Sequence, residues 1–201
     1  MVLAGVGDMK KYDNTKIPKG LSSSESFIGT MSAASNLVEN QAIGDALSIT
    51  MVEKPGTNIS YGVVATYAKK STSENPIINV TTNYDGKTVS YNIKVNEVDP
   101  NHASRLEMFA LCAYADDVGT GDKSTFGTYQ TIRTYQEMAK YNGFISSDSE
   151  GDTLEQFKSE KSKWSNMGRK VMDLLYKCND LAQYNKGMSI MDLFKDYPKV
   201  K

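Results

Sequence analysis

Apolar and polar side chains alternate along the chain from Ala46 to about Lys69. In the first segment Leu47, Ile49 and Met51 occupy every second position, the pattern of a half-buried β-strand with these side chains on one face. A turn at residues 55–58 follows, and it contains the adjacent proline and glycine that favour chain reversal. A second strand is then predicted from Ile59 to about Lys69, with its alternate residues Tyr61, Val63, Ala65 and Tyr67 on one face.

Two more strands follow a polar connection at residues 71–76. The third is predicted from Ile77 to about Asn83. Asp85 and Gly86 come next, and Asp-Gly is among the strongest short signals for a β-hairpin. In the fourth strand the alternate apolar positions are Val89, Tyr91, Ile93 and Val95. Four consecutive strands with short turns predict an antiparallel meander that has one covered face and one face in water.

From Leu106 onward the apolar spacing changes to three and four residues, which is typical of helices. The first helix is predicted to start at Asp99-Pro100 and to end near Asp117. A second should run from near Thr125 to Gly143, which would adopt the left-handed conformation. The longest should be opened by Asp152 and Glu155 and continue to Cys178, and a short one covers residues 189–197. The fold class is therefore α+β: a four-stranded antiparallel meander followed by three to four helices packing on one sheet face.

Residues 1–44 show no sustained hydrophobic period and contain several serines and glycines. We expect this segment to be a flexible or surface-pinned N-terminal arm. Residues 45–201 then form a single α+β domain, a size that folds without a metal ion or disulfide bond.

The charges are balanced, with 23 basic and 24 acidic residues and a net charge of −1. Nucleic-acid binders usually carry a concentrated basic surplus, so we expect no nucleic-acid partner. No apolar run approaches the roughly 18 residues of a membrane span. The first seven residues lack a basic start and are too short for a signal-peptide core, so we expect a cytoplasmic protein, with export by a specialised route left open.

The two cysteines, Cys112 and Cys178, each fall within an apolar helical pattern. They are expected to be reduced and buried, and a disulfide bond between two helices is the alternative. A catalytic thiol would need His102, the only histidine, as its partner. A zinc site or a serine triad would need the same histidine. We therefore predict no catalytic residue, although catalysis by two carboxylates needs no histidine and stays open.

Residues 119–125 resemble a phosphate-binding loop, because glycines precede Lys123, Ser124 and Thr125. The nucleotide-binding pattern requires glycine directly before the lysine, where this chain has Asp122. A weaker anion site remains reasonable, because free backbone N–H groups gather at the start of the helix that follows. The candidate ligand-binding residues are Gly119, Gly121, Lys123, Ser124 and Thr125. The alternative is that these residues form a flexible connector between helices.

The acidic loop around Asp148, Glu150 and Asp152 could be read as a calcium loop. Counted from Asp148, the EF-hand pattern needs glycine at the sixth position and glutamate at the twelfth. Those positions hold Thr153 and Ser159, so we predict no metal site and no cofactor.

Several strings of this sequence resemble a family of uncharacterised proteins from clostridial Gram-positive bacteria. The strings are Leu106–Asp116, Ser124–Thr131, Asn75–Ile78, and Phe157–Lys161 with Trp164. The resemblance covers about residues 45–195 and implies a bacterial origin, without an activity, a cofactor or a catalytic residue.

The sequence thus favours a non-enzymatic interaction or structural protein, because an open antiparallel sheet offers edges on which a protein partner can pair. Homo-oligomers are possible. One alternative is a module that binds a small ligand or anion at the connector of residues 119–128. The other is a carboxylate-based enzyme.

Overall fold

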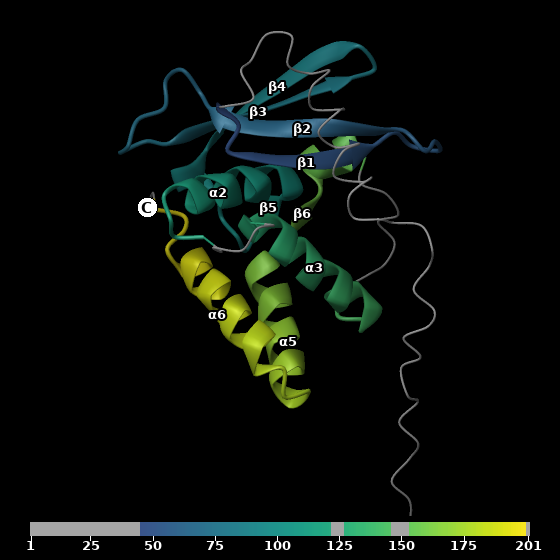
Figure 1. The fold of residues 1–201 in the computed structure, drawn as a ribbon, viewed down its shortest axis with the longest axis vertical. Coiled ribbons are helices and arrows are strands. Elements are labelled where there is room, and N and C mark those ends of the chain that lie inside the picture. The colour runs from purple at the N-terminus through teal and green to yellow at the C-terminus, as the bar shows by residue number, and fades with distance from the viewer. Residues whose placement is uncertain (1–44, 122–126, 146–152, 200–201) are drawn as a thin grey trace, which may run out of the picture.

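In the computed structural model, which describes residues 45–121, 127–145 and 153–199, the sheet and the helices form separate layers. The strands are β1 (Ser48–Glu53), β2 (Ser60–Tyr67), β3 (Ile77–Tyr84) and β4 (Lys87–Lys94). They lie in the order β1-β2-β3-β4, and every neighbouring pair is antiparallel (Figure 1). The predicted α+β class and its four-stranded meander are confirmed. The predicted arm of residues 1–44 lies outside the described residues and stays a prediction.

The β3–β4 hairpin closes through the predicted Asp-Gly turn. Asp85 and Gly86 have φ values of 51° and 73°, and they are flanked by the paired residues Tyr84 and Lys87. Two central residues in the left-handed region are characteristic of the type I′ turn, whose twist matches that of the strands. The turn fixes the register of the whole hairpin, so that Asn79 lies opposite Asn92.

One face of the sheet, called the inner face here, packs against the helices. Its central side chains are at most 1 % exposed: Val63, Ala65, Ile78 and Val80. The prediction for β1 needs a correction, because its buried residues are Thr50 and Val52, not Ile49 and Met51. The register places Thr50 opposite Val63, and this pairing decides which side chains of β1 point inward.

A 3₁₀ turn, η2 (Val95–Glu97), and a short strand, β5 (Ala103–Ser104), lead from the sheet into α2 (Arg105–Asp117). The predicted start at Asp99-Pro100 is wrong. Ser104 is the N-cap: its Oγ accepts from the Glu107 backbone N–H at 3.2 Å, and a Glu107 carboxylate oxygen accepts from the Ser104 N–H at 2.7 Å. This reciprocal pair satisfies two helix-end donors, whereas Asp99 stabilises a preceding turn by accepting from the Asn101 N–H. The predicted end at Asp117 is confirmed.

The second helix, α3 (Gly127–Tyr141), ends before Gly143, whose φ of 68° confirms the predicted left-handed residue. The last helix, α6 (Leu181–Lys195), has 15 residues and begins eight residues before the predicted start at residue 189. Its start is fixed by Asp180, whose carboxylate accepts from the Gln183 N–H at 3.2 Å.

The predicted long helix is broken into α4 (Leu154–Ser159), the short strand β6 (Lys161–Ser162) and α5 (Trp164–Lys177). Thr153 and Gln156 cap α4 in place of the predicted Asp152 and Glu155. The break has a tertiary cause, because β6 pairs with β5 in a two-stranded sheet. The Trp164 side chain, fully buried, adds a hydrogen bond from Nε1 to the Ala103 carbonyl at 2.8 Å. The backbone at Lys161–Ser162 is therefore extended because it pairs with β5.

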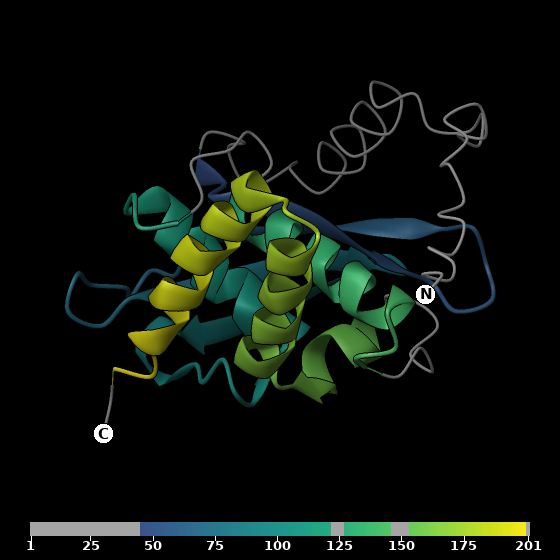
Figure 2. The ribbon, with the colours of Figure 1, turned by 90° about the horizontal axis from the view of Figure 1, so that it is seen from below.

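The helices form two layers on the inner side of the sheet. α2 packs directly on the sheet and on α3, and α3 packs on α5. α5 and α6 lie side by side (Figure 2), and they are farther from the strands than α2 is (Figure 1). Their contact is close, since a Cβ added at Gly168 would lie 2.3 Å from the Met191 sulfur. No helix in the described part of the chain is both long enough and apolar enough to span a membrane.

Both cysteines are free thiols, and only one of them is buried as predicted. Cys112 is fully buried in α2, while Cys178 is exposed just after α5. The correction for Cys178 follows from the arrangement of the helices. Its position is the C-cap of α5, where the chain turns outward towards α6.

Candidate functional site

The face of the sheet turned away from α2, called the outer face here, carries a ladder of polar side chains on β3 and β4. Asn79 is its centre: its Nδ2 donates to Ser90 Oγ at 2.7 Å and to Asn92 Oδ1 at 2.8 Å. Its Oδ1 accepts from the Thr81 hydroxyl at 2.7 Å. Side chains alternate between the faces of a strand, so the register assigns these outer positions: Ile77, Asn79, Thr81, Asn83, Thr88, Ser90, Asn92 and Lys94. None of them is acidic.

β4 pairs with β3 along one edge, and its opposite edge has no partner strand among the described residues. In a two-residue hairpin the pair that flanks the turn is hydrogen-bonded, and the pairs then alternate. Tyr84 and Lys87 are that pair, so Thr88, Ser90 and Asn92 direct their backbone N–H and C=O groups away from β3. We call this row the β4 edge.

The β1 edge is different, because Glu53 of β1 forms a bridge with Thr153 at the start of α4. A segment of the protein itself therefore already occupies part of that edge. The β4 edge is the longer unpaired row in the part of the sheet that the structure describes.

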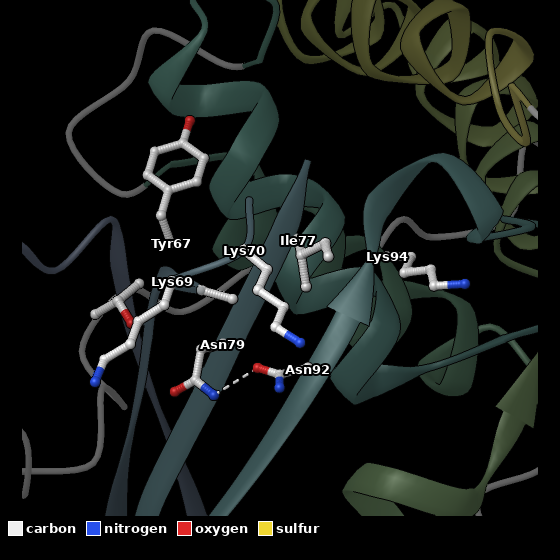
Figure 3. Close-up of a pocket in the computed structure, with 9 residues that line it drawn as sticks. Tyr67, Lys69, Lys70, Ile77, Asn79, Asn92 and Lys94 are labelled. Atoms are coloured by element: carbon white, nitrogen blue, oxygen red, sulfur yellow. Dashed lines mark hydrogen bonds between the residues drawn. The ribbon is translucent and has the colours of Figure 1, made fainter. Parts of the chain in front are cut away.

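A groove of about 480 Å³ lies on the outer face, where β4 ends and the chain leaves β2. Lys69 and Lys70 of the β2–β3 connection line it, together with Lys94 and the Asn79–Asn92 pair (Figure 3). Ile77 contributes an apolar side chain. We call it the lysine groove.

The charged side chains that line the lysine groove are all basic, because the lining includes three lysines and no carboxylate. Lys94 has its own counter-charge, since its ammonium lies 2.8 Å from Glu97 Oε1. Lys69 and Lys70 form no ion pair or hydrogen bond with any described residue. In Figure 3 the Lys70 side chain extends towards the Asn79–Asn92 pair. The groove thus offers ammonium groups and amides to an anion.

Tyr67 borders the lysine groove and connects β2 to the end of α2. Its hydroxyl donates to Asp117 Oδ2 at 2.7 Å. Partial burial, together with this hydrogen bond, raises the pKa of Tyr67 to about 12. The phenol is therefore a protonated donor at neutral pH and does not serve as a base.

The anion site predicted at residues 119–125 is only partly described. Lys123, Ser124 and Thr125 lie outside the described residues; Gly119 has a φ of 76° and Gly121 packs against Asp116. The Asp116 carboxylate accepts from the Thr128 backbone N–H at 2.9 Å and from the Thr128 hydroxyl. The protein's own carboxylate therefore lies at the first turn of α3, where an external anion would have to bind. The predicted site stays a prediction.

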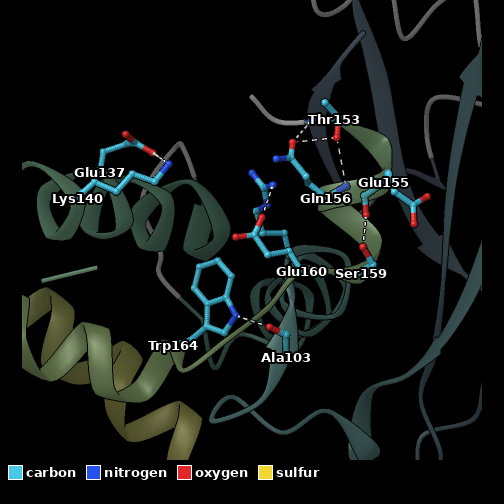
Figure 4. Close-up of polar contacts among 10 residues, drawn as sticks. Ala103, Glu137, Lys140, Thr153, Glu155, Gln156, Ser159, Glu160 and Trp164 are labelled. Carbon is cyan, nitrogen blue, oxygen red and sulfur yellow. Dashed lines mark hydrogen bonds and ion pairs between the residues drawn. The ribbon is translucent and has the colours of Figure 1, made fainter. Parts of the chain in front are cut away.

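A second cavity, of about 300 Å³, lies beside α3 and the start of α5. Its lining mixes Glu160 with lysines such as Lys163 and with the apolar Met167. Glu160 (Figure 4) is oriented by the buried Arg105, whose Nη2 lies 3.5 Å from Glu160 Oε2. Charges of both signs favour no ligand class, so this cavity is the weaker candidate.

The remaining reactive groups do not converge. Cys112 is an unsuitable nucleophile, because burial raises the pKa of its thiol well above the ordinary value. His102 is exposed, and the described residues contain no cluster of three potential metal ligands. Asp85 is held by Lys54, whose ammonium lies 2.7 Å away, and by the Tyr61 hydroxyl. Hydrogen bonds from these two groups lower the pKa of Asp85, so it is an ionised structural partner.

Sequence reasoning did not single out the lysine groove, although one signal for it exists. Counting equally outward from Asp85-Gly86 places Asn79 opposite Asn92, on the polar face of the predicted hairpin. The contribution of Lys69 and Lys70 could not be found in this way, because it depends on the path of the connection after β2.

Comparison with known proteins gives no assignment. No family model matches the chain, and searches of curated proteins and of solved structures gave no match. The resemblance to clostridial proteins therefore stays a prediction, and the function has to be argued from the geometry of the β4 edge and the lysine groove.

Proposed function

We propose that this protein is a non-enzymatic interaction protein that binds an extended segment of a partner protein along the β4 edge. The observation that carries the proposal is the eight-residue length of β4 together with its pairing on one side only in the described structure. An unpaired row of N–H and C=O groups is the template on which a strand adds to a sheet.

The side chains beside this edge suit selective pairing. An added strand would place alternate residues against the half-buried Val89, Tyr91 and Ile93, and the others beside Ser90 and Asn92. The first set contacts an apolar row and the second a polar one, so the partner segment should alternate in the same way. Exposed lysines at both ends of β4 oppose indiscriminate sheet-to-sheet association.

The alternatives have less support. A carboxylate-based enzyme needs an acid with a raised pKa in a cleft. The partly buried carboxylate of Glu107 is instead paired with Lys161. Burial would raise its pKa, but hydrogen bonds from Lys161 and the Ser104 backbone outweigh that effect and lower it.

We retain the bacterial origin and cytoplasmic location as parts of the proposal, to be checked by fractionating the source cells.

The test uses Ser90→Pro with Ser90→Ala as its matched control. Both variants lose the hydroxyl that accepts from Asn79, but only proline removes the outward N–H of the β4 edge. Because this N–H takes no part in the β3–β4 ladder, both variants should fold. In affinity capture from extracts of the source organism, partners held by strand pairing should be retained by wild type and Ser90→Ala and lost by Ser90→Pro.

The capture needs a check on folding, such as matching urea midpoints for the two variants. If every captured protein binds folded Ser90→Pro as well as it binds Ser90→Ala, the β4 edge is not the interface and the proposal fails.

A further inference from the structure

Three lysines line the lysine groove, and its lining contains no carboxylate. Lys94 is paired with Glu97, a residue that does not line the groove. Two adjacent lysines, Lys69 and Lys70, line the groove without such a partner among the described residues. Gathering like charges in one concavity is unfavourable unless a counter-charge binds there.

A neutral donor complements these ammonium groups. Asn79 Nδ2 donates to Asn92 Oδ1, and this bond fixes which end of the Asn92 amide faces its neighbour. The Asn92 Nδ2 group is left to donate elsewhere, and the described residues supply no acceptor for it. Ammonium and amide donors on one wall match the oxygen atoms of a carboxylate or phosphate.

The size and the apolar part of the groove narrow the ligand class further. About 480 Å³ falls within the roughly 300–1,000 Å³ typical of small-molecule sites and far exceeds the space that a bare inorganic anion needs. Ile77, on the outer face of β3, and the methylene stems of the lysines supply apolar contact. The site is therefore suited to a ligand with an apolar body and an anionic group.

We infer that the lysine groove is a binding site for small organic anions, with Lys69 and Lys70 as the charge partners and Asn92 as the orienting donor. This inference is independent of strand pairing at the β4 edge. Carboxylates and phosphate monoesters share the chemistry that the groove recognises, and the experiment separates them.

The experiment is an NMR titration of the ¹⁵N-labelled protein with four probes: benzoate, phenyl phosphate, inorganic phosphate and the neutral benzamide. Benzoate or phenyl phosphate should shift the backbone amides of Lys69, Lys70, Ile77 and Asn92. Benzamide, which has nearly the shape of benzoate without its charge, should bind at least severalfold more weakly. Inorganic phosphate should also bind more weakly than phenyl phosphate, because it makes no apolar contact.

Lysine variants locate the charge partners. Lys70→Gln should weaken binding of the better aromatic anion about two- to fivefold, the range expected for one exposed ion pair, and Lys69→Gln with Lys70→Gln should weaken it further. Lys177→Gln, at an exposed site on α5, is the control and should leave the affinity unchanged.

The inference is overturned if none of the probes shifts these amides at about 10 mM. It is equally overturned if benzamide binds as tightly as benzoate, or if the double variant binds as wild type does. Each of these results leaves the capture by wild-type and Ser90→Ala protein unaffected, so failure of the anion site and failure of the interaction function are distinguishable.

Discussion

The two faces of β3 show how this protein separates folding from binding. Ile78 and Val80 point to the inner face and are at most 1 % exposed. Their neighbours Ile77 and Asn79 point to the outer face, where Asn79 centres a polar ladder and both line the lysine groove. Consecutive residues of β3 therefore have different roles. The side chains on the inner face pack against the helices, whereas those on the outer face can be substituted without removing core contacts.

The largest effect that tests this comparison comes from shortening two adjacent isoleucines. Ile78→Ala removes a fully buried side chain, and we expect it to lower the free energy of unfolding by about 2–5 kcal/mol. Ile77→Ala makes the same chemical change one position away, on the outer face, and should cost less than about 1 kcal/mol. Urea denaturation followed by tryptophan fluorescence measures both, because Trp164 is the only tryptophan and is fully buried. Equal losses would show that both faces of the sheet are core.

The sheet was largely predictable from the sequence because strand patterns are local. Alternation located all four strands, and Asp85-Gly86 located the hairpin and fixed its register. The buried face of β1 was not predictable in this way, since its apolar residues occupy both sets of alternate positions. Thr50 is buried because it lies opposite Val63, and this pairing depends on β2 and cannot be read from β1 alone.

The helix errors have the same origin. From Phe157 to Cys178 the apolar spacing is helical, without a proline and with one glycine, so local sequence predicts a continuous helix. The chain is extended at Lys161–Ser162 because β5 pairs there, a contact between segments far apart in the sequence. The start of α2 was readable, however, because Ser104 and Glu107 have the spacing of a capping box, a stronger signal than Asp99-Pro100.

An intermediate effect is expected from pH, because one acid-sensitive carboxylate, that of Glu107, lies in the helical layers and not on the outer face. Glu107 accepts from the Ser104 N–H and from Lys161, and its pKa lies below 4.5 in the folded protein. A carboxyl with a lowered folded pKa stabilises the fold above its unfolded pKa and loses that contribution as the pH falls through the folded value. Glu107→Gln should therefore cost about 1–2 kcal/mol at pH 7, with a difference from wild type that shrinks below about pH 4.5.

The matched control for this prediction is Glu97→Gln, in η2 just after β4. Glu97 pairs with Lys94 on the surface, where about half of each side chain is exposed. Its loss should change the free energy of unfolding by less than about 1 kcal/mol at any pH. Urea midpoints between pH 3 and pH 7 measure both variants. A constant difference between Glu107→Gln and wild type over that range would contradict the assigned role of the Glu107 charge.

The site was less predictable than the fold, for a physical reason. The candidate at residues 119–125 was chosen from residues adjacent in sequence, whereas the lysine groove assembles the β2–β3 connection, β3 and β4. Lys69 and Lys70 look like ordinary solvated residues in the sequence. Only the folded sheet shows that they line a groove together with Asn79 and Asn92, without an acidic neighbour in its lining.

Asn79→Ala should affect stability less than Ile78→Ala or Glu107→Gln does, and it gives the sharpest distinction between the two faces. Its three side-chain hydrogen bonds are on the half-exposed outer face, where water can replace them, so the cost should be at most about 1 kcal/mol. The variant releases the Asn92 amide from its fixed orientation, and binding of benzoate or phenyl phosphate in the groove should weaken about twofold or more. Thr81→Val is the control, because it removes a hydroxyl of the same ladder that does not line the groove. Urea midpoints together with probe titrations decide the outcome: a large loss of stability in Asn79→Ala would make the polar ladder part of the folding core and would remove the separation between the faces of β3.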